Sequence, residues 1–257
     1  MVGLVIVSHS ASLAEGVVEL ARGMGGDEVA IEPAGGLDLP ERPLGTDAAL
    51  VAAAIERADA GDGVLVLMDL GSAVLSAELA LDLLAPERRR GVLLCEAPLV
   101  EGAVAAAVSA KIGAPLAEVA AEARSGLEPK VTHLGSAEPE AGEAGFAGKA
   151  LTLRLELTNP LGLHARPAAR FVQTAAKFDA VVEVTNVTSG RGPGSARSLN
   201  ALATLGARRG HELLVTARGA QAAGALAALQ ALAERSFDEG GDEPPPAPLR
   251  VPAPPEG

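Results

Sequence analysis

Val2-Gly-Leu-Val-Ile-Val7, at the start of the chain, is a short and continuous apolar run. Such a run predicts a strand that is buried on both faces of a sheet. Ser12-Leu-Ala-Glu15 follows closely and has the form of a capping box, which predicts that Ser12 is the N-cap of a helix reaching to about Met24. His9 therefore lies where a buried strand passes directly into a helix.

Strand and helix patterns keep alternating up to about residue 130. Further strands are predicted over 28–32, 63–68 and 91–95, and further helices over 46–60, 72–84, 98–111 and 115–124. Thr46 is the expected N-cap of the second helix. Alternation of this kind implies an α/β fold with a mainly parallel, doubly wound sheet, and we assign it to a first domain over residues 1–130.

The composition changes after residue 130. Residues 131–149 are rich in Gly, Ala, Glu, Ser and Pro without a period, and are predicted to be a linker. From Leu151 to Thr158 apolar and polar residues alternate strictly, which predicts a strand with one buried face and one solvent-exposed face. The patterns over 150–236 follow the order β-α-β-(β)-α-β-α, an α+β open-faced sandwich. The Pro-rich acidic tail, 237–257, is expected to be disordered.

The composition excludes several classes of protein. Trp and Tyr are absent, which argues against stacking platforms for nucleic acid or sugar. The single cysteine, Cys95, excludes an internal disulfide and a cysteine zinc site. No apolar run is long enough to span a membrane, and Met1–Val7 lacks the basic region of a secretory leader. We expect a cytoplasmic protein that binds neither membrane nor nucleic acid.

Charge is divided unevenly between the two domains. Residues 1–130 hold 20 acidic and 9 basic residues, net −11, whereas residues 150–236 hold 5 acidic and 10 basic residues, net +5. An acidic domain tied to a basic domain suggests that the two dock on each other. The alternative is two surfaces that are solvated independently, and the sequence does not decide between them.

Two of the four histidines, His9 and His164, occupy similar places. Each follows the first strand of its domain and immediately precedes a helix, and Pro167 lies in the first turn of the second of these helices, where proline is tolerated. A helix N-terminus offers unpaired N–H groups and the positive end of the helix dipole, so it is a ready anion site. An imidazole there can accept a phosphoryl group. The sequence contains no Walker-type lysine motif, and we expect no bound cofactor and no metal.

The segment Asn159-Pro-Leu-Gly-Leu-His-Ala-Arg-Pro-Ala168 closely resembles the active-site motif of HPr, the histidine phosphocarrier family of the phosphoenolpyruvate:sugar phosphotransferase system. The resemblance covers about 150–236 and implies phosphorylation of His164 on Nδ1, with Arg166 as the active-site arginine. Arg166 as a plain surface charge is the alternative. Ser198 matches the family's regulatory serine, although we favour a plain helix cap there.

Residues 1–125 resemble the mannose-type IIA family. The matching stretches include Ile6-Val-Ser-His-Ser10, Pro43-Leu-Gly-Thr-Asp47 and Val66-Leu-Met-Asp-Leu-Gly-Ser-Ala73. The resemblance implies phosphorylation of His9 on Nε2. Asp69, at the carboxyl end of a strand, is expected to accept a hydrogen bond from Nδ1–H of His9, with a helix-start cap as its alternative role. Gly71, Ser72 and Thr46 are further candidates for donors to the phosphate.

Within that family the chain looks like the phosphoryl donor subunits of dihydroxyacetone kinase. This implies a relay in which enzyme I, a separate protein, phosphorylates His164 from phosphoenolpyruvate. Phosphate then passes to His9 and on to ADP held by a nucleotide-binding kinase subunit, while a ketone-binding subunit completes the reaction. The resemblance also implies a homodimer through the first domain. The alternatives are the energy-coupling component of a mannose-type sugar permease and a regulatory protein that signals by its phosphorylation state.

Overall fold

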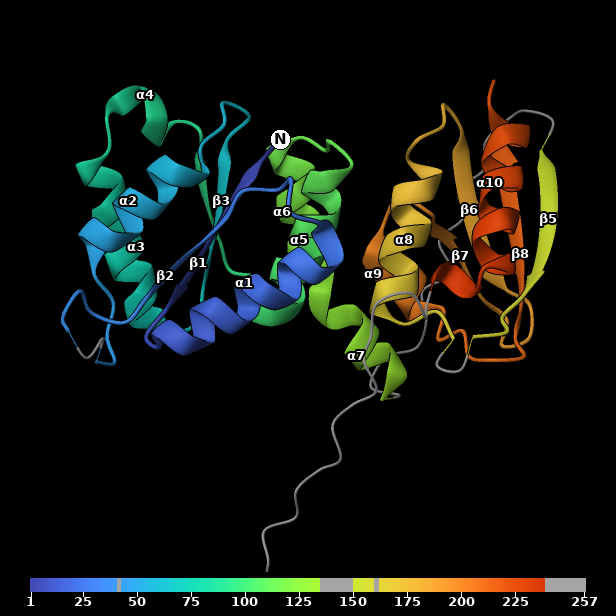
Figure 1. The fold of residues 1–257 in the computed structure, drawn as a ribbon, viewed down its shortest axis with the longest axis horizontal. Helices are drawn as coiled ribbons and strands as arrows, with labels where there is room; N and C mark the ends of the chain where they lie inside the picture. Colours follow the sequence, from blue (N-terminus) through green and yellow to red (C-terminus); the bar gives the residue numbers. More distant parts are fainter. Residues whose placement is uncertain (41–42, 135–149, 160–161, 239–257) are drawn as a thin grey trace, which may run out of the picture.

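A computed structural model describes residues 1–40, 43–134, 150–159 and 162–238. They form two units that lie side by side (Figure 1). The first unit comprises the described residues up to 134, and the second comprises the described residues from 150 to 238.

The first unit is built on a parallel sheet with the strand order β2-β1-β3-β4. Its strands are β1 (Gly3–Ser8), β2 (Ile31–Gly35), β3 (Val64–Met68) and β4 (Val92–Cys95). Its helices are α1 (Ala11–Gly25), α2 (Ala48–Ala58), α3 (Gly71–Leu83), α4 (Pro86–Arg89), α5 (Leu99–Lys111), α6 (Leu116–Arg124), the 3-10 helix η1 (Ser125–Leu127) and α7 (Glu128–His133).

Helices cover both faces of this sheet, as the continuous apolar strands require. Leu4 and Ile6 of β1 belong to the core beneath α1, α5 and α6, whereas Val5 and Val7 belong to the core beneath α2 and α3. All four side chains are fully buried. The prediction of a doubly wound parallel sheet is confirmed.

The second unit is an antiparallel sheet with the strand order β5-β8-β6-β7. Leu213, Val215 and Ala217 of β8 are buried while the residues between them are partly exposed, so helices cover one face only. The predicted α+β open-faced sandwich is confirmed. The elements are β5 (Leu151–Glu156), α8 (Ala165–Ala175), β6 (Val181–Asn186), β7 (Arg191–Ser195), α9 (Leu199–Thr204), β8 (Glu212–Arg218), α10 (Ala222–Glu234) and the 3-10 helix η2 (Ser236–Asp238).

Two predicted helix starts are wrong. The N-cap of α1 is Ser10, whose hydroxyl oxygen accepts a hydrogen bond from the Leu13 N–H at 3.3 Å, and Ser12 lies inside the helix. The N-cap of α2 is Asp47 rather than Thr46, because the Asp47 carboxylate accepts from the N–H groups of residues 49 and 50. In both cases another good capping residue stood within two positions of the predicted one.

The domain boundaries differ slightly from those that the composition suggests. Helix α7 includes residues 131–133, and the rest of the predicted linker from 135 to 149 lies outside the described residues. At the other end, Phe237 is only 1% exposed and its carbonyl accepts a hydrogen bond from Arg170. The second unit thus reaches Asp238, and the predicted tail over 239–257 also lies outside the described residues.

The two units pack against each other through α1, α5 and α7 of the first unit and α8 and α9 of the second. Val104 and Val108 of α5 are buried in the same apolar cluster as the core of the second unit. Of the two interpretations of the charge asymmetry, the structure shows docked units, which are joined by these apolar side chains and by hydrogen bonds such as that from the Ser198 hydroxyl to Glu122. Among the described residues, no helix has the length and apolar character needed to cross a bilayer.

Candidate functional site

His9 and Asp69 meet because of the strand order. Strand β1 has β2 on one side and β3 on the other, so the chain reverses its direction of winding between β1 and β3. His9 directly follows β1, and Asp69 directly follows β3. Both therefore lie at the carboxyl edge of the sheet, at the switch point where open α/β sheets bind their ligands.

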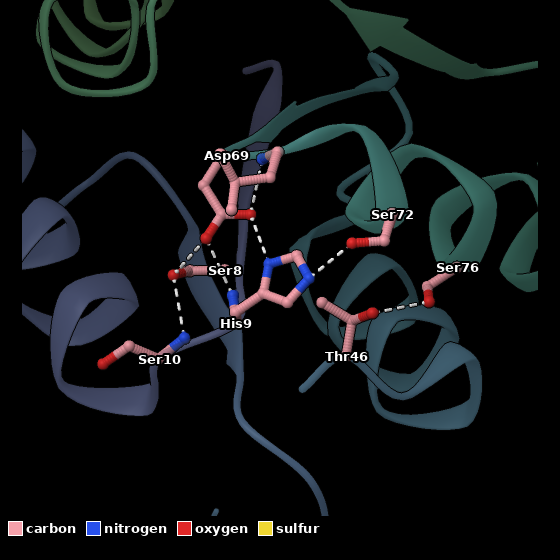
Figure 2. A network of polar contacts seen from close by, with 8 residues as sticks. Ser8, His9, Ser10, Thr46, Asp69, Ser72 and Ser76 are labelled. Carbon is pink, nitrogen blue, oxygen red and sulfur yellow. Dashed lines mark hydrogen bonds and ion pairs between the residues drawn. The ribbon is translucent and has the colours of Figure 1, made fainter. Parts of the chain in front are cut away.

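The His9 ring is held between a carboxylate and a hydroxyl (Figure 2). Nδ1 lies 2.9 Å from Oδ1 of Asp69, and Nε2 lies 2.6 Å from the Ser72 hydroxyl oxygen. Since an ionised carboxylate can only accept, Nδ1 carries the proton and Nε2 keeps its lone pair. The Ser72 hydroxyl then donates to Nε2, so the nitrogen that faces α3 is the unprotonated one.

Asp69 is itself fixed by several donors. Its Oδ2 accepts from the His9 N–H at 2.8 Å and from the Ser8 hydroxyl at 2.9 Å, and its Oδ1 accepts from the Leu70 N–H at 2.7 Å. Burial raises the pKa of the Asp69 carboxyl, but these hydrogen bonds and that of the His9 ring outweigh it and hold the pKa below its ordinary value. Asp69 is therefore an anion at neutral pH, in a single orientation.

The other predicted donors lie at the same rim. Gly71 and Ser72 are the first two residues of α3, whose N-terminus adjoins the His9 ring. Thr46 follows Gly45, whose N–H donates to the His9 carbonyl at 2.9 Å, and the Thr46 hydroxyl bonds the Ser76 hydroxyl at 2.7 Å (Figure 2). A phosphoryl group on Nε2 would thus meet the Ser72 hydroxyl and the positive end of the α3 dipole.

Ser8 was missed by the sequence analysis. Its side chain is fully buried, donates to Asp69 and accepts from the Ser10 N–H at 3.1 Å. The sequence does place the Ser8 hydroxyl at the end of a buried apolar strand. A buried hydroxyl needs a hydrogen-bond partner, and this could have marked Ser8 as a candidate.

His164 is the N-cap residue of α8 and is half-buried. Its N–H donates to the Gly162 carbonyl at 3.0 Å, and the buried Asn159 amide donates to the same carbonyl at 2.6 Å. Arg166 lies exposed in the first turn of α8. These contacts hold the loop that presents His164 at the start of a helix.

His164 lines a cavity of about 460 Å³ to which both units contribute. Arg208 of the second unit lines it, together with Lys130 and His133 of α7. Ser198, the remaining candidate, is the N-cap of α9 and accepts from the Ala201 N–H at 3.0 Å. Within the described part of the chain, no three His, Cys, Asp or Glu side chains group to hold a metal ion.

Both units match known families. Residues 3–120 match the family described as "PTS system fructose IIA component", and residues 151–235 match "PTS HPr component phosphorylation site". The curated relatives include "PEP-dependent dihydroxyacetone kinase, phosphoryl donor subunit DhaM" of Escherichia coli, with 45% identity over 98% of this chain. A subunit of the same name from Klebsiella michiganensis is also 45% identical over 98% of this chain.

These two relatives are longer proteins, and this chain spans 54% of the length of each. A shorter relative, "PEP-dependent dihydroxyacetone kinase 2, phosphoryl donor subunit DhaM" of Listeria innocua, is 40% identical over 44% of this chain and 88% of its own length. The similarity to the two long relatives extends over both units of this chain, and the short relative is matched over nearly its whole length. The chain therefore belongs to the DhaM family.

Proposed function

We propose that the chain is a phosphoryl relay subunit of a phosphoenolpyruvate-dependent dihydroxyacetone kinase. His164 accepts a phosphoryl group from enzyme I, His9 takes it from His164, and ADP on a nucleotide-binding kinase subunit takes it from His9. The ketone-binding subunit then completes the phosphorylation. The observation that supports this most is the fixed His9 tautomer, with Asp69 on Nδ1 and a lone pair on Nε2.

In the transfer to His9, the Nε2 lone pair forms the new N–P bond while the bond from phosphorus to the His164 nitrogen breaks. The electron pair of the broken bond returns to the His164 ring. Positive charge develops on the His9 ring during attack, and the Asp69 carboxylate, 2.9 Å from Nδ1, offsets it. The Ser72 hydroxyl, 2.6 Å from Nε2, then turns to a phosphoryl oxygen.

The same proposal includes a homodimer through the first unit in the cytoplasm. One face of α3 carries three exposed leucines, Leu75, Leu79 and Leu83, whose exposed fractions are 61%, 59% and 61%. A second copy packed there would remove this apolar surface from water.

Labelling with radioactive phosphoenolpyruvate and purified enzyme I tests the relay. His164→Ala should take up no label, and His9→Ala should be labelled on His164 alone. His211→Gln is the control, because that ring bonds Asn186 at 3.1 Å in the same unit and has no proposed part in transfer. Label on His9 of the His164→Ala protein would contradict the order of the relay.

The final acceptor is tested separately. Phosphate on His9 should be lost to ADP only when the nucleotide-binding kinase subunit is present. If it passed instead to a sugar permease component that co-purifies with the chain, the permease alternative would replace the kinase.

A further inference from the structure

We propose that the docked arrangement of the two units is a resting state that keeps His164 away from His9, and that Glu122 of α6 holds it closed. Transfer within one chain then requires the second unit to leave this surface and meet the His9 rim. The inference rests on the proposed relay, and it assigns to the first unit a docking surface separate from its phosphoryl site.

The apolar half of this surface is helix α5. An amphipathic helix at the edge of a sheet buries one stripe, but in α5 every residue from Gly102 to Ala110 is buried. Ala103, Ala106 and Ala107 face the sheet of the first unit, whereas Val104 and Val108 lie in the core cluster of the second. A first unit without its partner would expose those two valines to water.

The polar half is centred on Glu122. One carboxylate oxygen accepts from the Ser198 hydroxyl at 2.8 Å and from the Asn200 N–H at 3.0 Å. The Asn200 side-chain amide donates to the Glu122 carbonyl at 2.7 Å and to the Ser125 hydroxyl at 2.8 Å. Asn200 is only 5% exposed. If these contacts broke while the two units stayed docked, the polar groups of Asn200 would be buried without hydrogen-bond partners. Glu122 thus caps α9 of the other unit from outside.

The docked arrangement places the two histidines at opposite ends of α1. His9 precedes the first turn, whereas the Gln173 amide of α8 donates to the carbonyl of Met24 in the last turn at 2.9 Å. Arg166, two residues from His164, lines a cavity with residues 23–26 at the same end. The 15 residues of α1 span about 21 Å, whereas transfer needs reacting atoms within roughly 3.5 Å.

Figure 1 shows the same relation, with α1 running from the rim of the first sheet towards α8. The His164 cavity is lined by α7 and by the second unit, and among the residues that line it none belongs to the His9 rim. The observed arrangement is therefore incompatible with direct transfer between the two histidines of one chain.

The test compares the whole chain with variants on both sides of the surface. Glu122→Ala and Asn200→Ala should raise the radius of gyration measured by small-angle X-ray scattering without phosphate present. They should also speed single-turnover transfer from phosphorylated His164 to His9 about tenfold, which corresponds to about 1.4 kcal/mol of lost docking. Glu118→Ala, which removes the same charge from the same helix, is the control and should leave both measurements near those of the wild type.

Glu122→Gln separates charge from geometry, because its amide oxygen can still accept from Ser198 and Asn200. It should restore most of the docking. A wild-type protein already extended in solution, or variants that leave both measurements unchanged, would overturn the inference. So would a larger radius with slower transfer, because the docked arrangement would then be the transfer encounter. A rise in the radius of gyration without any delivery of phosphate to His9 would contradict the proposed relay. It would still support the docking surface at Glu122.

Discussion

At the scale of single residues, Asp69 connects the fold of the first unit to its chemistry. Four donors converge on its two oxygens, one from Ser8 at the end of β1, two from His9 and one from the N-cap of α3. The same hydrogen bonds that fix the carboxylate fix the tautomer of the His9 ring. A change at Asp69 should therefore affect the rate of transfer more than the fold.

Asp69→Asn should slow transfer through His9 on the order of 10²-fold, because an amide does not offset charge on the ring and can present an N–H to Nδ1. The rate is measured by rapid quench, and ¹⁵N shifts of the ring report the tautomer. Asp82→Asn, which removes a carboxylate paired with Arg89 on the surface of α3, is the matched control. Equal rates in the wild type and Asp69→Asn would reduce Asp69 to a structural role.

The low pKa of Asp69 also predicts a dependence of stability on pH. A carboxyl whose folded-state pKa lies below its ordinary value of 3.8 stabilises the fold above that value and loses this contribution as pH falls through the folded-state pKa. The advantage of the wild type over Asp69→Asn in free energy of unfolding should be constant near neutrality and shrink below about pH 4. Urea titrations at several pH values measure it. An advantage that grew on acidification would contradict the assignment.

At the scale of elements, helix starts depend on one capping residue. Ser10 caps α1 and adjoins His9, whereas Ser12 is exposed within the first turn. Ser10→Ala should therefore lower the free energy of unfolding by about 1 kcal/mol. Ser12→Ala should leave it unchanged or raise it slightly, since alanine is the better helix former. Chemical denaturation of the two variants checks this, and equal losses would favour the capping box at Ser12 after all.

The start of α9 combines a cap with the docking surface. Ser198→Asp keeps a capping oxygen for the Ala201 N–H but places a carboxylate against Glu122, where the wild-type hydroxyl donates at 2.8 Å. Like charges at that distance repel, so the variant should open the docked arrangement and increase the radius of gyration. Ser189→Asp adds the same charge in an exposed turn of the same unit and should not. An unchanged radius in Ser198→Asp would show that this contact does not govern docking.

At the scale of the whole molecule, the connection between the units sets how often they meet. Joining two binding partners in one chain gives each an effective concentration near the other of roughly millimolar. Cleavage at a protease site introduced within 135–149, followed by dilution to micromolar concentration, should slow His164-to-His9 transfer by roughly 10² to 10³-fold. Mixing the two parts at high concentration is the control and should restore the rate. A rate that survived both cleavage and dilution would mean that the connection has no kinetic role.

The sequence by itself determined the two units, their fold classes and the placement of His9 and His164 between a strand and a helix. These features depend on local patterns, such as the apolar run of Val2–Val7 and the alternation from Leu151 to Thr158, which fix burial residue by residue. The rim position of Asp69 and its bond to His9 were also expected, partly from the resemblance of this segment to a known family.

Only the tertiary structure decided which segments distant in the chain touch. His9 and Asp69 are 60 positions apart, and they meet because β1 pairs with β3 in the order β2-β1-β3-β4. Ser198 and Glu122 are 76 positions apart, and no local pattern joins them. Local patterns set how deeply a residue is buried, but strand order and helix packing choose its partner, because those depend on the free energy of the whole fold.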